Sequence, residues 1–241
     1  MRFYSMLGAL QPLAPKLALH GAAGTSAGAL LTFSLLALKT PSAVLNYFMK
    51  NPLTLITSPM SLTNLGNFGL TNGANLMRFC KQCVKDLIGS DTTRMNELPF
   101  DWRASVTDLV RKENYLVSRK DNWLVADVLY ATMCIPPYFP PLQAYERLLV
   151  DGGVTDNCPV PRDFNANETV VLSVSAVPYM PTDFMSYAAC VWDSLAKPAV
   201  PAGMASVRLH PTAIKAYDIS VTLDCMSRAV QEGSEQAASQ I

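Results

Sequence analysis

Charged residues are scarce in this 241-residue sequence, and neither sign is in excess. Only 16% of the residues are charged, and 19 lysines and arginines balance 19 aspartates and glutamates, so that the formal net charge is zero. Proteins that bind nucleic acid normally carry a clustered basic face, which a neutral and weakly charged chain does not supply. We therefore expect no nucleic-acid partner.

Long uninterrupted hydrophobic runs are also absent. Half of the residues are hydrophobic, which is enough for a large core, but the longest nearly apolar run covers only residues 27–38. A helix that crosses a bilayer needs roughly 20 such residues. Pro12, Pro15 and Lys16 interrupt residues 1–23, which otherwise resemble the apolar part of a signal peptide. We expect neither a signal peptide nor a transmembrane helix, and a cytoplasmic or peripherally membrane-associated protein.

Cysteines are present in a pattern that favours packing over chemistry. The six cysteines are scattered through apolar or helical contexts, which predicts reduced, buried thiols rather than a disulfide framework. Cys80 and Cys83 have the spacing of a redox motif but lie within a predicted helix that no strand precedes. No cluster of His, Cys and Asp has the spacing of metal ligands, so we expect no metal and no cofactor.

The sequence does contain an alternation of predicted strands and helices. This alternation predicts an α/β fold: a three-layer sandwich with a mainly parallel central sheet and helices on both faces, formed by residues 1–241 as a single domain. Pro41 is expected to stop the first helix, and Asp121 to cap the third. Residues 52–71 are rich in turn formers and predict an exposed loop or cap. The expected strands are residues 17–23, 104–110, 115–118, 147–150 and 169–177, and the expected helices are residues 27–38, 72–88, 123–134, 184–195 and 218–237.

A serine stands between the first predicted strand and the first predicted helix, in the stretch "HGAAGTSAGALLTF". Ser26 is the centre of Gly24-Thr25-Ser26-Ala27-Gly28, and Gly-x-Ser-x-Gly in this context is typical of a nucleophile on a strained turn. The helix N-terminus and the backbone N–H of Ala27 would stabilise an oxyanion there. The alternative is a crossing of small residues between two buried elements.

A nucleophilic serine needs a base, and the sequence offers few. His20 lies in the strand expected to lead into the turn, and His210 is expected on the surface before a proline. Asp151 ends a short strand, as Ser26 does, and reactive groups in parallel sheets gather at the carboxyl ends of strands. An aspartate before two glycines is also a common turn cap. The residues alone leave both roles of Asp151 open.

The segments "GTSAGAL" and "LLVDGGVTDNCPVP" together resemble the patatin-like phospholipase family, whose nucleophile lies in Gly-x-Ser-x-Gly and whose base lies in Asp-Gly-Gly or Asp-Gly-Ala. The segments "LGNFGLTNGANL" and "VADVLYATMCIPPYFPPL" between them are similar to family segments too. The resemblance runs from about residue 2 to the aspartate motif. It implies that Ser26 is the nucleophile and Asp151 the general base of a dyad without histidine. The remaining motif residues are Gly24, Thr25, Ala27, Gly28, Gly152 and Gly153, with Ala27 as one backbone oxyanion donor.

The same resemblance implies a lipid acyl hydrolase of the phospholipase A, lysophospholipase or acylglycerol lipase type, which forms an acyl-enzyme. Its substrate would be a phospholipid or acylglycerol, at a membrane or lipid surface. Residues 53–70 would contact acyl chains or that surface, or would be an ordinary packed loop.

The sequence departs from the family at its start. The family carries a Gly-Gly-Gly-x-Arg/Lys-Gly loop that donates oxyanion N–H groups, and "RFYSMLGAL" aligns with its end. Arg2 falls on the basic position, Phe3 replaces the last glycine, and Gly8 belongs to the helix that follows. Either the written chain is a truncated form or part of the oxyanion site is lost. We expect the chain as written to have weak or no hydrolase activity, since one lost donor costs on the order of 3 kcal/mol in the barrier.

Two alternatives remain. A pseudo-phospholipase would bind lipid or a protein partner without turnover. A Ser-His-Asp hydrolase would use Ser26, Asp151 and His210, but only 25 residues precede Ser26, which leaves no room for the strands that such folds place first.

Overall fold

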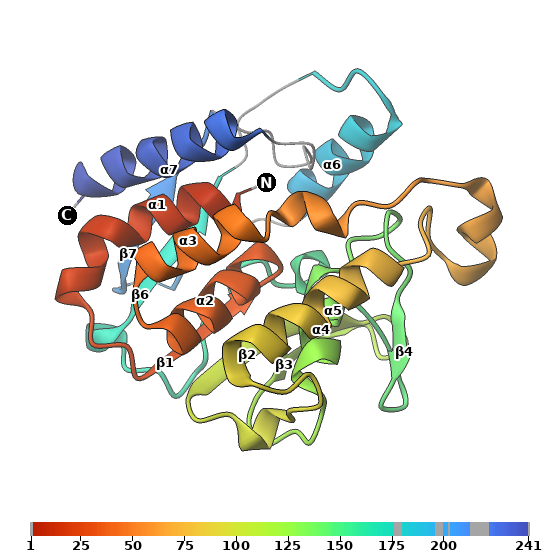
Figure 1. The fold of residues 1–241 in the computed structure, drawn as a ribbon, viewed down its shortest axis with the longest axis horizontal. Coiled ribbons are helices and arrows are strands. Elements are labelled where there is room, and N and C mark those ends of the chain that lie inside the picture. The colour runs from red at the N-terminus through yellow and green to blue at the C-terminus, as the bar shows by residue number, and fades with distance from the viewer. Residues whose placement is uncertain (1, 176–179, 196–199, 202, 213–221, 241) are drawn as a thin grey trace.

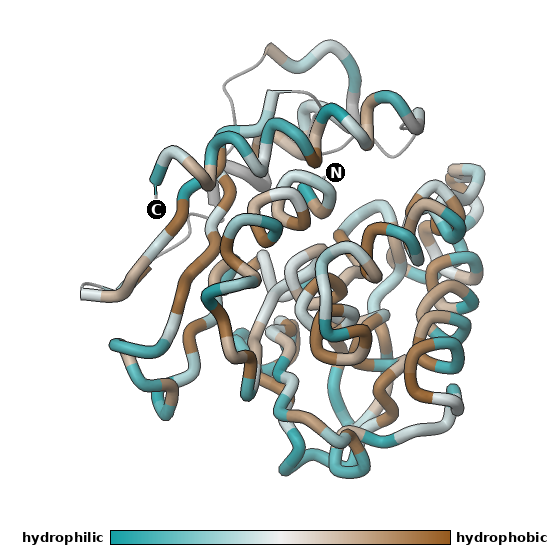
Figure 2. The backbone as a smooth tube through the Cα atoms, turned by 60° about the vertical axis from the view of Figure 1, so that its left-hand side comes forward, coloured by the Kyte–Doolittle hydropathy of each residue, from teal (hydrophilic) through white to brown (hydrophobic). Residues whose placement is uncertain are grey.

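The computed structural model describes residues 2–175, 180–195, 200–201, 203–212 and 222–240. Its helices pack around a five-stranded sheet and a separate pair of strands (Figure 1). Hydrophobic residues gather in the interior and hydrophilic residues in the outer loops (Figure 2). The predicted α/β fold is confirmed.

The direction of the strands is more mixed than expected. The larger sheet has the order β1 (Gly21–Thr25), β2 (Asp101–Asp108), β5 (Arg147–Asp151), β4 (Leu142–Ala144), and β3 (Glu113–Val117) also pairs with β2. Only β1 and β2 are parallel within it. Short turns connect β2 to β3 and β4 to β5, and such hairpins impose antiparallel pairing. The second sheet, β6 (Val170–Val174) and β7 (Ala205–Leu209), is parallel as expected.

The described helices agree closely with the hydrophobic pattern. α2 (Ala27–Leu38) and α6 (Phe184–Leu195) have the predicted bounds, and α4 (Ala74–Ile88) and α5 (Val125–Met133) begin two residues later than predicted. α1 (Phe3–Leu13) and α3 (Pro41–Lys50) complete the N-terminal half. α7 (Leu223–Ala238) is the last, and the predicted residues 218–221 lie outside the described residues, as do residues 176–177 of the last predicted strand.

Three local predictions need correction. Pro41 does not stop α2. That helix ends at Leu38, and Lys39, which follows it, has a left-handed conformation. Pro41 is instead the first residue of α3, where its fixed φ suits a helix start. Asp121 does not cap α5, because its carboxylate accepts hydrogen bonds from the Ser118 N–H and the Tyr115 hydroxyl. The first strand begins at Gly21 rather than residue 17, since its pairing with β2 begins there.

The cysteines carry no disulfide. All six are free, with Cys80, Cys83 and Cys134 buried and Cys158, Cys190 and Cys225 partly exposed. Cys80 and Cys83 lie inside α4, as expected from the helical pattern.

α1 is buried and packs along α7. Phe3 is fully buried and contacts the ring of Phe48 with 4.5 Å between centroids, so its ring belongs to the core. Gly8 of α1 and Gly233 of α7 allow the two helices to cross closely. A Cβ at Gly8 would overlap the Val230 carbonyl, and a Cβ at Gly233 would overlap the Ser5 carbonyl. The crossing therefore requires glycine on both helices.

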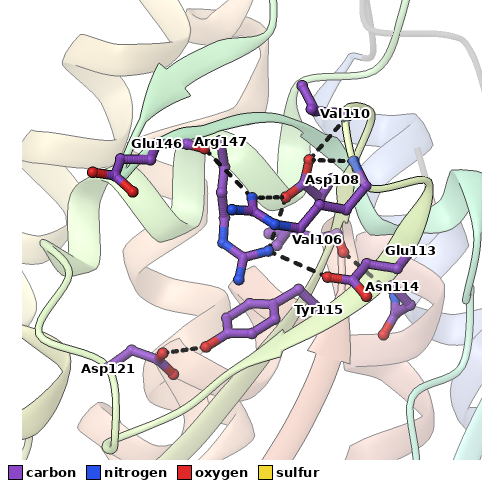
Figure 3. A network of polar contacts seen from close by, with 10 residues as sticks. Val106, Asp108, Val110, Glu113, Asn114, Tyr115, Asp121, Glu146 and Arg147 are labelled. Atoms are coloured by element: carbon purple, nitrogen blue, oxygen red, sulfur yellow. Dashed lines mark hydrogen bonds and ion pairs between the residues drawn. The ribbon is translucent and has the colours of Figure 1, made fainter.

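A buried ion cluster fixes β5 against β2 (Figure 3). The fully buried carboxylate of Asp108 accepts hydrogen bonds of 2.8 Å from both Arg111 and Arg147, and backbone N–H groups of the β2–β3 turn also bind it. The Arg147 guanidinium lies 4.1 Å from the centre of the Tyr115 ring. Arg147 begins β5 and Asp151 ends it, so this cluster anchors the strand that carries the predicted base.

Candidate active site

Ser26 occupies a strained turn between β1 and α2. Its φ of 54° and ψ of −123° lie in a region that residues with a Cβ rarely adopt. Gly24 permits this turn, because a Cβ there would lie 2.5 Å from the Gly28 carbonyl carbon. Gly28 itself has nothing within 4 Å of its own ideal Cβ position, so packing requires only the first glycine of the motif. Thr25, between them, donates its hydroxyl to the Asp156 carbonyl at 2.9 Å.

A buried threonine braces the turn from α5. The Ser26 N–H donates to Thr132 Oγ1 at 2.9 Å, and the Thr132 hydroxyl donates to the Ser105 carbonyl at 2.7 Å. The chain of hydrogen bonds links the turn to β2 through α5. Sequence reasoning missed Thr132, whose only signal was its place as a polar residue in the apolar helix "VADVLYATM".

Asp151 is buried at the carboxyl end of β5. Its Oδ1 accepts a hydrogen bond of 2.8 Å from the Gly153 N–H, so the turn-capping interaction is present. Its Oδ2 is buried, and no donor among the described residues forms a hydrogen bond of normal length and angle with it. Gly152 must be glycine, since a Cβ there would overlap the Ser105 carbonyl. The carboxylate thus uses one oxygen for the turn and leaves the other without a partner among the described residues.

The ends of β1 and β5 meet on one edge of β2. β1 pairs with β2 as far as Ser105, and β5 pairs with the next residues, with Asp151 opposite Val106. β3 pairs with β2 residues 104–108, so it occupies the other edge along that whole span. β1 and β5 therefore lie end to end. This register brings Ser26, which follows β1, next to Asp151.

Burial raises the pKa of Asp151 to about 7, and the nearby Ser26 hydroxyl and the Gly153 N–H oppose that rise. Removal from water disfavours the charged carboxylate, and no cation is among the causes of the shift. A carboxyl group with this pKa exchanges its proton near neutral pH, which an ordinary surface aspartate does not do.

The two histidines lie apart from this pair. His20 is exposed and precedes β1 instead of lying in it, although it is among the residues that line the cavity described below. His210 is exposed and follows β7. Its backbone N–H donates to Gln236 Oε1, and its backbone carbonyl accepts from Gln236 Nε2. It is not among the described residues that line the cavity. The arrangement of Ser26, Asp151 and His210 as a triad is therefore not seen.

Ser26 and Asp151 open onto one cavity of about 1040 Å³. Its walls are largely apolar. They include residues of α1, α2, a short 3-10 helix at Leu53–Ile56 and the proline-rich segment after α5, together with residues of β1, β6 and α6. The apolar lining from the first three of these elements includes Met6, Leu10, Leu13, Leu30, Leu31, Leu35, Leu53 and Ile56. Such a wall suits a hydrocarbon chain, which supplies no polar groups to pair.

The N-terminus of α2 faces the same site. The first bond of this helix runs from the Leu30 N–H to the Ser26 carbonyl, so the N–H groups of Ala27, Gly28 and Ala29 have no carbonyl partner inside the helix. Ala27, directly after the serine, is where the resemblance predicts an oxyanion donor.

No single helix in the described ranges has both the length and the apolar composition to span a membrane. α2 and α3 pass that test only as a pair, and they are bent by 114° where they meet. In the same ranges, no group of three or more His, Cys, Asp or Glu side chains is placed to bind a metal ion.

Comparisons with known proteins bear on the family and the fold. A family model described as patatin-like phospholipase matches residues 1–163. The fold is similar to that of VipD from Legionella pneumophila, with a TM-score of 0.56 and 16% identity over 99% of this chain. This chain spans 64% of the VipD chain, and at that identity the likeness concerns the fold alone. No curated protein sequence matches significantly. Since the family model covers well over half of its residues, the chain belongs to the patatin-like phospholipase family.

Proposed function

We propose that this protein hydrolyses lipid esters with Ser26 as nucleophile and Asp151 as general base. The observation that carries the proposal is the pairing of a strained serine with a buried, partly unsatisfied carboxylate at one end of an apolar cavity. Membership of the family supports lipid acyl hydrolysis in general. The dyad and the type of ester are the finer parts of the proposal.

The reaction has two balanced halves. The Ser26 hydroxyl attacks the ester carbonyl carbon and gives its proton to Asp151 Oδ2, while the Ala27 N–H stabilises the oxyanion. The tetrahedral intermediate expels the alcohol, which takes the proton from Asp151 and leaves an acyl-serine. Water then attacks the acyl-serine with Asp151 again accepting a proton, and the returning proton restores the Ser26 hydroxyl as the fatty acid leaves.

The environment of Asp151 suits this role. A general base works best when its pKa lies near the working pH, because it is then both ionised and able to hold the proton. Burial places the pKa of Asp151 at about 7. The capping bond from Gly153 fixes the carboxyl orientation without consuming Oδ2.

The cavity supports an acyl chain as the bound group and a phospholipid or acylglycerol as the substrate. Phospholipase A, lysophospholipase and acylglycerol lipase activities share this chemistry and differ in the alcohol that leaves. The substrate is a component of a membrane or lipid surface, so we propose peripheral association during turnover.

The test is release of fatty acid from mixed phospholipids and neutral glycerides by wild type and Ser26→Ala. We expect release by wild type alone, with both proteins equally folded by circular dichroism. Equal release by both proteins contradicts the assignment of Ser26. Lipid binding without release by either protein favours the pseudo-phospholipase.

A further inference from the structure

One segment beside the cavity carries exposed apolar side chains on its outer surface. We define residues 53–70 as the apolar cap, which includes the short 3-10 helices Leu53–Ile56 and Leu62–Asn67. It projects from the molecule as the orange segment at the right of Figure 1. Its large apolar residues with more than half of their surface in solvent are Leu55, Met60, Leu62, Leu65 and Phe68.

The apolar cap lies in an uncharged stretch of the chain. Residues 51–77 contain no Asp, Glu, Lys, Arg or His. Clustered apolar side chains on a surface mark an interaction site. Anionic membranes attract Lys and Arg, which this stretch lacks. The surface therefore matches a neutral or zwitterionic partner.

The base of the apolar cap is held in place by backbone hydrogen bonds. The Leu70 N–H donates to the Pro137 carbonyl at 2.8 Å, and the Thr71 N–H donates to the Tyr138 carbonyl at 3.0 Å. The Ser61 N–H donates to the Leu70 carbonyl at 2.7 Å, so the two ends of the loop formed by residues 61–70 are joined at this base. The exposed side chains are thus presented by an ordered backbone.

The cap and the cavity share part of their structure. Leu53 and Ile56, at the start of the cap, line the cavity. Pro137 and Tyr138, which hold the base of the cap, line it as well. The start and the base of the cap therefore lie at the wall of the cavity, so that a lipid bound at the cap would be close to it.

Phe68 is unsuited to its position on grounds of stability. It has φ of 62°, in the left-handed region, and 71% of its surface is exposed. Glycine or asparagine adopts this conformation at lower cost, and neither would lose packing at so exposed a place. Neither packing nor backbone conformation accounts for an aromatic residue here, whereas aromatic rings at the level of lipid headgroups are favourable.

We propose that the apolar cap docks on a neutral or zwitterionic phospholipid membrane and holds the cavity entrance against it. The passage of lipid from membrane to cavity rests on the proposed function. The docking itself is a binding property and is measured without catalysis.

The experiment measures co-sedimentation with phosphatidylcholine vesicles in the Ser26→Ala background, so that no lipid is consumed. The cap variant is Leu62→Gln, Leu65→Gln, Phe68→Asn, and the matched control is Val110→Gln, which changes a residue 67% exposed in the β2–β3 turn. We expect half-binding of the cap variant to require at least about tenfold more lipid, since three apolar side chains no longer insert. The control should bind like its parent, and raised salt should not weaken binding.

Phe68→Asn alone separates docking from folding. We expect it to weaken vesicle binding while its midpoint of urea denaturation stays equal to or above that of the parent. Reduced binding together with a lower midpoint would indicate a structural role and would overturn the assignment of Phe68.

Equal binding by the parent and the cap variant overturns the docking proposal. The docking proposal is also overturned if the parent binds no vesicles but forms a dimer in analytical ultracentrifugation, and the cap variant does not form this dimer. Failure of the proposed function gives a different result. In that case the protein releases no fatty acid but still binds vesicles, and the cap variant binds them less. Hydrolysis of a water-soluble short-chain ester by wild type and by the cap variant with Ser26 intact should be equal.

Discussion

The backbone at Ser26, with φ of 54° and ψ of −123°, favours glycine over any residue with a Cβ. We expect Ser26→Gly to have a free energy of unfolding about 1 kcal/mol above that of Ser26→Ala, because relief of strain outweighs the greater entropy of glycine in the unfolded chain. Both variants lack the hydroxyl, so the difference between them in urea denaturation contains the backbone strain and the unfolded-state entropy but no effect of the hydroxyl. Equal or lower stability of the glycine variant would contradict a strained turn.

The raised pKa of Asp151 predicts the pH dependence of ester hydrolysis. The base acts when ionised, so kcat/KM should rise with pH and reach half its plateau near pH 7 rather than near pH 4. Asp151→Asn should abolish the rate, whereas His20→Ala and His210→Ala should keep both the rate and the midpoint. Loss of the rise at pH 7 in His210→Ala would instead support a histidine base.

At the scale of elements, the crossing of α1 and α7 depends on two glycines. Gly233→Ala places a methyl group against the Ser5 carbonyl, and we expect destabilisation of about 1–3 kcal/mol from overpacking. Gly28→Ala in α2 is the matched control, since nothing lies within 4 Å of its new Cβ and alanine favours helix. Thermal unfolding of both variants checks this. Equal melting temperatures for wild type and Gly233→Ala would mean that the helices separate at little cost.

Most helices and strands could be predicted because the apolar and turn-forming residues within each segment are enough to determine them. α2 is apolar on nearly every face and has glycine at its start, so that both its burial and its bounds follow from composition. The position of Asp151 at a strand end also followed from two local signals, the apolar run before it and the two glycines after it.

Features that depend on distant partners could not be predicted this way. The start of β1 is set by the first residue of β2 that pairs with it, and the antiparallel direction of β5 is set by its hairpin with β4 and its pairing with β2. Thr132 contacts the Ser26 N–H across 106 residues of sequence. Nothing in its own neighbourhood identifies that contact.

At the scale of the whole molecule, the buried Asp151 makes folding less favourable as pH rises. The native pKa of about 7 lies above the ordinary value of 3.8, so the folded state holds a proton between these values that the unfolded state has released. Stability from this group is therefore complete below about pH 4 and lost as pH rises through 7, by on the order of 4 kcal/mol.

Asp151→Asn removes this titration. We expect its free energy of unfolding, minus that of wild type, to increase by a few kcal/mol between pH 4 and pH 7.5 and then to stay constant. Urea denaturation across this range gives the difference, in which the other titrating groups cancel. A difference independent of pH would show that the Asp151 carboxyl is not desolvated in the folded protein.

We infer that α1 and α7 belong to one folding unit, although the family model ends at residue 163 and α7 lies beyond it. The two helices approach each other most closely where Gly8 lies against Val230 and Gly233 lies against Ser5. A fragment cut at the end of the family match would leave in water the side of α1 that packs on α7.

The crossing of α1 and α7 also sets the order of events during synthesis. The ribosome makes α1 before any other described helix and α7 after all of them, so α1 must wait for its partner until residues 223–238 have emerged. Contacts between such distant segments form slowly, and an apolar helix without its partner is a site for aggregation and for chaperones. Nascent chains that stop short of α7 should therefore be held by chaperones, and release should coincide with the arrival of that last helix.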